Sequence, residues 1–519
     1  MRIFITFTLC LFIVLTSQAN SEPKIKTYNI KGFILEGFVD EPEHKLQLSV
    51  IKRQLIVGLK KYKYRLSVNQ MHYFAEYLTT LYKNKGLLFH KVIVPPQEIK
   101  KKRLRLKLVP GILGDINVRD NSLYSSDRIK LPFLPLLKKP ISKEKVEEAL
   151  LMLNDSPGLN VFSFFSRGKE KNETRINIKV QEENRFNAII KADNYGVEST
   201  GKNRLLTQFA YNNPFGRADQ ISFGVLASNG SVYGSLGYQA PLWNPFHTFS
   251  VSISNNEFDL AGDFSSLGVE GATLVARFDI NHILSRGYQS NKKLSWYFDK
   301  KDSSLKNSAG YTQLDKDEKS NGVGINTLID SMGDGYQNRL YLNAYSGQYK
   351  SGFSTLNGER FDLANLVVSS QYNLISNDSY FHSKIGLLFR LQKTSDALPS
   401  YEKFSLTGID GVRALESGIV STDNGKLARL SWHSLNTKWL GDNAFSKNTR
   451  LTLFYDWAEG NNSQSSVKES ASGLGVLLNF ALAKNLNGQV LYASTNDLNI
   501  STLAKKESSY AYAELVYRF

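Results

Sequence analysis

The sequence predicts two small α+β units followed by a transmembrane, antiparallel β-barrel of about 16 strands. Three observations support this fold class. After residue 184 helical periodicity disappears, and short alternating runs follow, separated by clusters of Gly, Asn, Asp and Ser. No run of eighteen apolar residues occurs after Ala19, so the chain could cross a bilayer only as a closed barrel. The last alternating run ends on an aromatic residue, Phe519.

Residues 1–19 are typical of a signal peptide. Arg2 supplies the positive charge, residues 3–15 are apolar, and Ser17-Gln18-Ala19 has the small-x-small pattern of a cleavage site. The apolar run is too short for a membrane anchor. The only cysteine, Cys10, lies in this segment, so the expected mature chain can form no disulfide and no cysteine metal site.

The net charge of the chain indicates which kinds of partner it could bind. Its 519 residues carry 64 Lys and Arg against 48 Asp and Glu, a net charge of +16. Such a balance suits nucleic acid, acidic lipid headgroups or an acidic protein. Export through a signal peptide makes nucleic acid the least expected of these, so no nucleic-acid partner is predicted.

The N-terminal part is predicted to hold two α+β units, at residues 20–118 and 119–183. In the first, a basic amphipathic segment covers residues 45–59, and a helix capped by Ser67 ends at Gly86. In the second, Ser142 begins a helix that precedes strands near residues 159–165 and 174–180. The short sheets have open edges, which are either solvated or able to take up an extended peptide.

From residue 184 to 519 the chain is predicted to form the barrel. Sixteen runs of membrane-spanning length are an even number, as antiparallel closure requires. A soluble β-sandwich would also alternate polar and apolar residues, so alternation alone leaves both open. The runs begin near residues 185, 203, 218, 231, 246, 270, 292, 319, 336, 363, 380, 424, 448, 470, 486 and 508.

A long loop near residues 400–423 holds a glycine-rich turn. Gly408 and Gly411 permit a sharp bend that would present Arg413 at its tip, with Val412 beside it. In the run that follows residue 448, alternation turns Asp456 into the lumen, where a carboxylate needs water or a cation. If the loop folds inward, Arg413 could form a bidentate pair with Asp456. Taken alone, a Gly-x-x-Gly turn is more often a solvated surface loop.

Several motifs resemble one family, the TpsB-type outer-membrane transporters of two-partner secretion, of the haemolysin-activator kind. Val94-Pro95-Pro96-Gln97-Glu98-Ile99, with the later Pro110-Gly111, is similar to the signature of the family's first POTRA domain. Asp193-Asn194-Tyr195-Gly196 and Asn212-Asn213-Pro214-Phe215-Gly216 resemble the start of its barrel. The resemblance covers nearly the whole mature chain in the right order. It implies roles for Pro96, Gln97 and Gly111 in the POTRA fold.

The resemblance also implies roles for the loop and the C-terminus. Gly411-Val412-Arg413-Ala414-Leu415 is similar to the family's Val-Arg-Gly-aromatic tip, and Phe454-Tyr455-Asp456-Trp457-Ala458 to its Phe-x-Asp-x-Gly strand; in the family the arginine and aspartate join inside the barrel. Ala414 and Leu415 stand where glycine and an aromatic are usual, so a looser tip is expected. Phe519 resembles the C-terminal signal that the barrel-assembly machinery reads. Too few residues follow Ala19 for the pore-plugging helix of some members.

The family resemblance implies a transporter in the bacterial outer membrane, in contact with its lipids and with POTRA domains in the periplasm. It would recognise an unfolded exported partner, of the haemolysin, adhesin or contact-dependent toxin type, and pass it through the barrel without ATP. No catalytic, cofactor or metal motif is present, so an enzyme is not predicted. The alternatives are an Omp85-type barrel-assembly factor and a soluble secreted β-rich adhesin.

Overall fold

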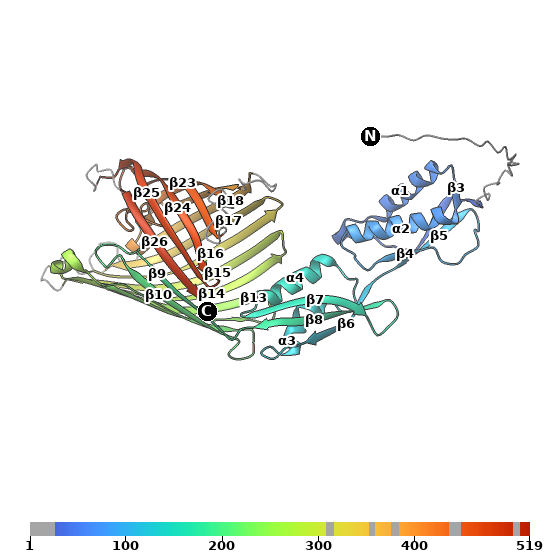
Figure 1. Ribbon diagram of the computed structural model, residues 1–519, viewed down its shortest axis with the longest axis horizontal. Coiled ribbons are helices and arrows are strands. Elements are labelled where there is room, and N and C mark those ends of the chain that lie inside the picture. Colours follow the sequence, from blue (N-terminus) through green and yellow to red (C-terminus); the bar gives the residue numbers. More distant parts are fainter. Residues whose placement is uncertain (1–25, 308–315, 352–358, 375–382, 435–447, 502–508) are drawn as a thin grey trace, which may run out of the picture. The chain divides into compact units, whose positions relative to one another are not determined.

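The computed structural model describes residues 26–307, 316–351, 359–374, 383–434, 448–501 and 509–519 (Figure 1). The predicted signal peptide lies outside these ranges. The chain divides into two compact units. The first comprises the described residues up to 112 together with 138–143 and 170–173, and the second comprises the remainder.

The first unit packs two helices on a three-stranded sheet of order β2-β5-β4. Helix α2 begins at a capping box, in which the Ser67 side chain accepts from Gln70 N and the Gln70 side chain accepts from Ser67 N. Leu59, Leu78 and Leu104 are fully buried between the helices and the sheet. The elements are β1 (Thr27–Asn29), β2 (Gly32–Glu36), η1 (Pro42–His44), α1 (Leu48–Lys61), β3 (Arg65–Ser67), α2 (Val68–Asn84), β4 (Lys91–Ile93) and β5 (Arg103–Val109).

A second three-stranded sheet, of order β6-β8-β7, repeats this plan in the second unit. Because β6 pairs in this sheet, the pairing divides the two α+β folds near residue 111. The expected boundary at 118 falls inside β6, since an isolated strand shows in its sequence no sign of the sheet it will join. The elements are β6 (Ile112–Arg119), α3 (Ser126–Lys130), η2 (Leu131–Leu136), α4 (Lys143–Asn154), β7 (Leu159–Arg167) and β8 (Glu173–Glu183).

The barrel closes with sixteen antiparallel strands in the described ranges, which confirms the predicted fold class. The two terminal strands, β9 and β26, meet over Glu514↔Asp193 to Arg518↔Ile189. The strands are β9 (Phe186–Asp193), β10 (Arg204–Asn212), β11 (Gln220–Ala227), β12 (Ser231–Pro241), β13 (His247–Asp259), β14 (Val269–Arg286), β15 (Ser290–Asn307), β16 (Lys316–Gly333), β17 (Tyr336–Ser351), β18 (Glu359–Asn373), β19 (Ser383–Lys393), β22 (Asn424–Ser434), β23 (Thr449–Asn461), β24 (Glu469–Ala483), β25 (Leu486–Asn499) and β26 (Ser509–Arg518). A short helix, η3 (Gly262–Leu267), precedes β14.

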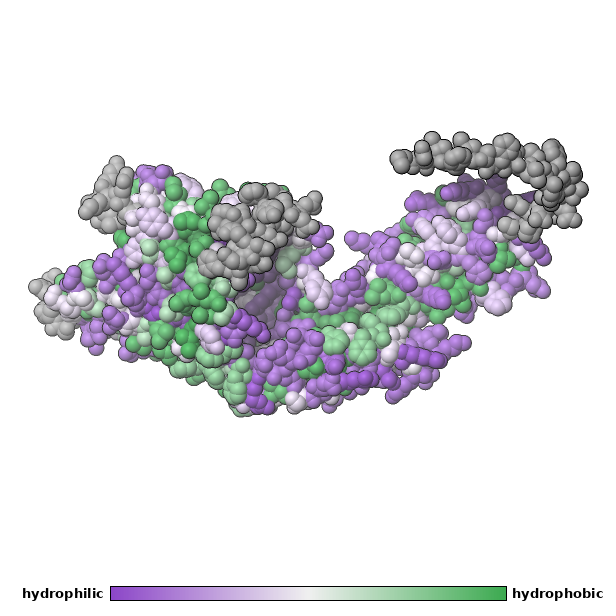
Figure 2. Space-filling model, viewed as in Figure 1, coloured by the Kyte–Doolittle hydropathy of each residue, from purple (hydrophilic) through white to green (hydrophobic). Residues whose placement is uncertain are grey.

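The barrel strands alternate between an apolar outer face and an inner face. In β23, Leu453 and Tyr455 are exposed outward, whereas Thr452, Phe454 and Asp456 are buried on the lumen side. Figure 2 shows hydrophobic residues gathered on the barrel's outer surface. An apolar exterior of this kind suits contact with lipid. In the described part of the chain no helix is long and apolar enough to span a membrane.

Candidate functional site

The site is built on the segment between β19 and β22, residues 394–423, which we call the lumen loop. It contains a short helix, η5 (Ser400–Glu402), and its two arms pair as β20 (Phe404–Ser405) and β21 (Ser421–Thr422). We call residues 394–405 and 421–423 the stem, and residues 406–420 the tip. Residues of the tip are buried against side chains of β23, β24, β25 and β26.

The tip is a tight turn that depends on two glycines. Val412 N donates to Leu406 O at 2.9 Å, and Gly411 N donates to Gly408 O at 3.0 Å. Gly408 has φ +88°, a conformation that costs other residues steric strain. A Cβ on Gly411 would lie 2.3 Å from the carbonyl carbon of Leu406. The turn thereby aims Val412 and Arg413 at the barrel wall.

Arg413 and Asp456 form a buried, bidentate pair. Arg413 Nε donates to Asp456 Oδ2 at 2.8 Å and Nη2 donates to Oδ1 at 2.8 Å, while the Arg413 backbone N–H also donates to Oδ2, at 3.2 Å. The guanidinium carbon lies 3.4 Å from the centre of the Phe454 ring. Arg413 is 6% exposed and Asp456 is fully buried. Such a pair fixes the direction of both side chains.

A second arginine, which sequence reasoning missed, shares the same carboxylate. Arg429 on β22 donates from Nε to Asp456 Oδ1 at 2.9 Å and from Nη2 to Gly411 O at 2.9 Å. Arg390 on β19 donates to Asp410 O at 2.7 Å. Arg429 stands opposite Asp456 in the β22–β23 register. Only that register reveals the contact, because alternation gives the facing of a side chain and not its cross-strand neighbour.

The two departures from the family's tip pattern are accommodated by packing. Ala414 and Leu415, which stand where the family has glycine and an aromatic residue, are both buried. A Cβ on Gly473 of β24 would lie 2.6 Å from the Ala414 Cβ, so the absence of a side chain at 473 makes room for the methyl group. Tyr512 OH donates to Leu415 O at 2.9 Å. A strand glycine and a tyrosine hydroxyl hold this tip.

The POTRA-type motif residues belong to the first unit, and the lumen loop belongs to the second. The Gln97 side-chain amide makes the two hydrogen bonds that the main chain of a neighbouring strand would make to Arg105. Its Nε2 donates to Arg105 O at 2.8 Å, and its Oε1 accepts from Arg105 N at 2.8 Å. Pro96, just before Gln97, is exposed. A Cβ on Gly111 would lie 2.2 Å from the Phe89 Cβ, so a side chain there would not fit.

The C-terminal residue lies on the barrel seam. Phe519 N donates to Ala188 O of β9 at 3.0 Å, and the ring is two-thirds exposed beside Tyr517. Lys191 of β9 contacts Glu514 of β26 across the seam at 3.1 Å, and it also contacts Asp193 of its own strand at 3.1 Å. Among the described residues no cluster of three or more His, Cys, Asp or Glu side chains could hold a metal ion.

Comparison with known proteins places the chain in a family. Residues 172–480 match the haemolysin secretion/activation proteins ShlB/FhaC/HecB. The heme/hemopexin transporter protein HuxB of Haemophilus influenzae is 26% identical over 487 residues, which cover 87% of this chain and 82% of HuxB. The hemolysin transporter protein ShlB of Serratia marcescens is 22% identical, over 72% of this chain and 66% of ShlB.

Solved structures share the fold. CdiB from Escherichia coli superposes with a TM-score of 0.75 at 16% identity, covering 98% of this chain and 93% of CdiB. BamA from Haemophilus ducreyi lacking POTRA domains 1–3 gives 0.55 at 12% identity, covering 95% of this chain and all of that one. The family match extends over more than half of the chain. The protein therefore belongs to the ShlB/FhaC/HecB family of TpsB transporters, which secrete a partner exoprotein through an outer-membrane barrel that carries periplasmic POTRA domains.

Proposed function

We propose that the lumen loop is the movable closure of the transport path and that Arg413 and Asp456 hold it in its resting position. The observation that carries this proposal is the buried, bidentate pair at the loop tip. A charged contact of this kind is directional, so a small displacement of the tip breaks both hydrogen bonds together. Gly408, Gly411 and Val412 support the pair by setting the turn. Passage of an unfolded chain would require the tip to leave the wall.

The two α+β domains, at about residues 20–111 and 112–183, are the proposed receptors for the exoprotein. Strands β2 and β4 are the edges of the first sheet, and an edge can bind an extended peptide through main-chain hydrogen bonds. Arg103, Arg105 and Lys107 alternate with buried leucines along β5, so one face of this sheet is basic. A basic face favours an acidic or acid-flanked segment of the partner. Pro96, Gln97 and Gly111 would act here by shaping the sheet.

Energy for transport would come from the exoprotein itself. An unfolded chain that folds after emerging loses its route back, so folding outside biases diffusion through the lumen. This path requires neither nucleotide nor metal. It also requires a barrel that is inserted in the lipid bilayer. The proposed role of Phe519 is to present the last strand to the barrel-assembly machinery during that insertion.

The receptor role of the α+β domains is tested with a secreted partner exoprotein. Both proteins are produced together in an outer-membrane host, and the exoprotein is measured at the cell surface and in the medium. We expect export with the intact chain and its loss when residues 26–111 are removed, with the barrel still heat-modifiable on gels. Undiminished export without residues 26–111 would contradict their role as receptor.

A further inference from the structure

The stem of the lumen loop has its own anchor, on a different part of the barrel from the tip. Glu402, in η5 of the stem, forms a salt bridge with Lys301 of β15. The tip pairs with β23. In the order of the barrel, β16, β17, β18, β19 and β22 lie between β15 and β23. The lumen loop is therefore attached at two well-separated places around the wall.

The Lys301 ammonium is enclosed. Its Nζ contacts Glu402 Oε1 and lies 3.6 Å from Asp299 Oδ2, and the Lys301 and Glu402 side chains are only 16% and 13% exposed. Nζ also lies 5.3 Å from the centre of the Tyr345 ring and 5.6 Å from that of Tyr401. Limited access of water strengthens both the ionic and the cation–π contacts compared with a surface pair.

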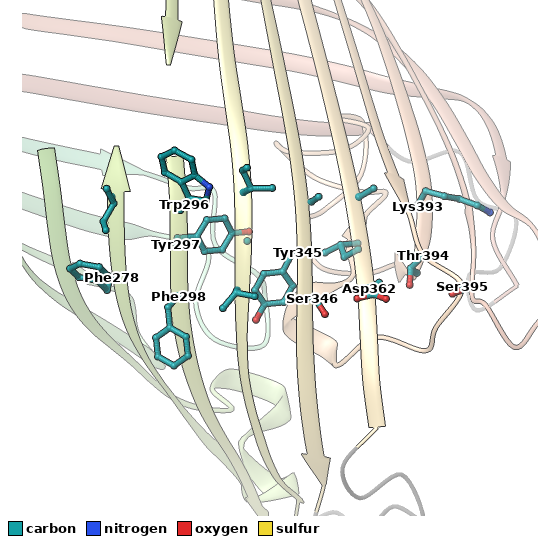
Figure 3. Close-up of a pocket in the computed structure, with 17 residues that line it drawn as sticks. Phe278, Trp296, Tyr297, Phe298, Tyr345, Ser346, Asp362, Lys393, Thr394 and Ser395 are labelled. Atoms are coloured by element: carbon teal, nitrogen blue, oxygen red, sulfur yellow. The ribbon is translucent and has the colours of Figure 1, made fainter. Parts of the chain in front are cut away.

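Aromatic and carboxylate side chains of the barrel wall surround the Lys301–Glu402 contact. The Tyr297 and Tyr345 side chains lie next to one another (Figure 3), and their rings are stacked with centres 5.9 Å apart. Tyr297 occupies the place of a missing side chain, because a Cβ on Gly324 of β16 would lie 2.1 Å from its ring. Tyr345 OH donates to Asp299 Oδ1 at 2.7 Å, which orients the carboxylate beside Lys301. Leu398 of the stem packs in the same apolar cluster.

The stem is also braced internally. Asp423 accepts from Leu398 N at 3.1 Å and contacts Lys403 Nζ at 3.1 Å, so one carboxylate ties the two arms together. Gln392, at the end of β19, donates to Glu402 O at 2.8 Å. These contacts, with the β20–β21 pairing, make the stem a unit to which the tip is attached.

From this arrangement we infer that Lys301 and Glu402 form a standing anchor for the lumen loop. The stem stays on the β15–β18 wall while the tip leaves Asp456, so opening is a swing of the tip about a fixed stem. The family motifs that mark the tip do not include either residue. This inference rests on the proposed function, because it specifies which part of the closure moves.

Crosslinking distinguishes a fixed stem from a moving one. With Cys10 changed to Ser, the chain holds no cysteine apart from the pair that is introduced. Lys301→Cys/Glu402→Cys and, as the matched pair, Arg390→Cys/Asp410→Cys, which joins the tip to β19 and leaves Arg413 and Asp456 in place, are joined in cells by a short bis-maleimide. Export is compared with that of the same uncrosslinked double variant.

We expect the stem crosslink to leave export within about twofold of its uncrosslinked control, and the tip crosslink to abolish it. A stem crosslink that blocks export as fully as the tip crosslink would overturn the fixed stem. Unimpaired export with the tip crosslinked would instead overturn the proposed function, so the two failures are distinguishable.

Conductance tests whether the charge pair is the anchor. In planar bilayers, Glu402→Gln and Lys301→Met are expected to show open events several times more frequent than wild type, because the stem no longer holds the loop. Lys301→Arg keeps the charge and should behave as wild type. Lys319→Met removes an exposed lysine of β16 that pairs with Asp302 and serves as the matched control. If Glu402→Gln and Lys301→Met both match Lys319→Met while migrating as folded barrels, the anchor is disproved.

Discussion

At the scale of single residues, the key contact of the lumen loop is one carboxylate shared by two guanidinium groups. Asp456 accepts from Arg413 and Arg429, and Arg429 also binds the carbonyl of Gly411. Arg429 thereby joins the barrel wall to the loop backbone whether or not Arg413 is in place. The two arginines lie on different parts of the barrel: Arg413 is in the tip and would move with it, whereas Arg429 belongs to a barrel strand.

Removing Arg413 tests the mobile half of the pair. In Arg413→Ala the buried carboxylate keeps Arg429, so the loss of loop–wall interaction is near the lower end for a broken buried pair, about 3 kcal/mol. We expect strongly reduced export from a barrel that still assembles, measured by secreted exoprotein and heat-modifiable migration. Arg360→Ala, at an exposed arginine of β18, is the control.

Removing Asp456 should have the larger effect. Asp456→Ala leaves Arg413 and Arg429 facing one another without a counter-charge; Arg413 loses its fixed direction, and Arg429 keeps its hydrogen bond to Gly411 O. We expect lower export than for Arg413→Ala, and frequent channel opening in planar bilayers. Export at the wild-type level in both Arg413→Ala and Asp456→Ala would refute the role of the pair.

At the scale of elements, the conformation of short segments is fixed by side-chain contacts as much as by strand pairing. The tip turn needs the left-handed conformation of Gly408, and its methyl-bearing neighbour Ala414 needs the bare backbone of Gly473. Gln97 completes the β5 ladder beyond the end of β4. In each case a side chain, or its absence, settles a local geometry that strand pairing leaves open.

Gly408→Ala should loosen the tip. The left-handed φ costs an L-residue about 1–2 kcal/mol, and the added Cβ would lie 2.3 Å from Ser417 Oγ. We expect faster proteolysis of residues 406–420 in intact protein and more frequent channel opening. Gly234→Ala, at a strand glycine with no heavy atom within 4 Å of the added Cβ, should change neither.

Gln97→Ala should weaken the middle of the first sheet. Two hydrogen bonds to Arg105 are lost, at about 0.5–1.5 kcal/mol each. We expect faster hydrogen exchange at the Arg105 amide, with Gln97→Glu intermediate because it keeps an acceptor. Glu98→Ala, at a highly exposed neighbour, should leave the rate unchanged. Equal exchange in Gln97→Ala and wild type would show that the contact is dispensable.

At the scale of the whole molecule, the two units depend on different interactions. The first has an apolar core in which His90 is buried and stacked on Tyr82, with ring centres 5.4 Å apart. Burial, and secondarily the nearby His44, lowers the pKa of His90 to about 4. The barrel instead relies on strand pairing around a closed circuit and on charged contacts inside its lumen.

Acid should therefore destabilise the first unit. Unfolded, His90 takes up a proton below its ordinary pKa of about 6.5, whereas the folded unit keeps it neutral down to about 4. The stability due to the neutral ring is complete above pH 6.5 and is lost progressively as pH falls toward 4, by about 2–3 kcal/mol.

Hydrogen exchange of residues 26–112 in the full chain, corrected for intrinsic rates, measures this loss. His90→Phe should remove most of the pH dependence, and His72→Phe, at an exposed histidine on α2, should retain it. If hydrogen exchange in His90→Phe depends on pH as in wild type, the acid sensitivity comes from groups other than His90.

The sequence by itself determined the number and place of the strands, because a period of two and the spacing of turn residues are local properties. Alternation left a sandwich and a barrel open, and the family motifs in the sequence favoured the barrel. The sequence placed the sixteen strands within a few residues and turned Asp456 inward. Tertiary structure alone decided the register that sets Arg429 against Asp456, the joining of β6 to the second sheet and the contact of Glu402 with Lys301. These join residues distant in sequence, and no local pattern records which distant side chain will lie opposite when a barrel closes.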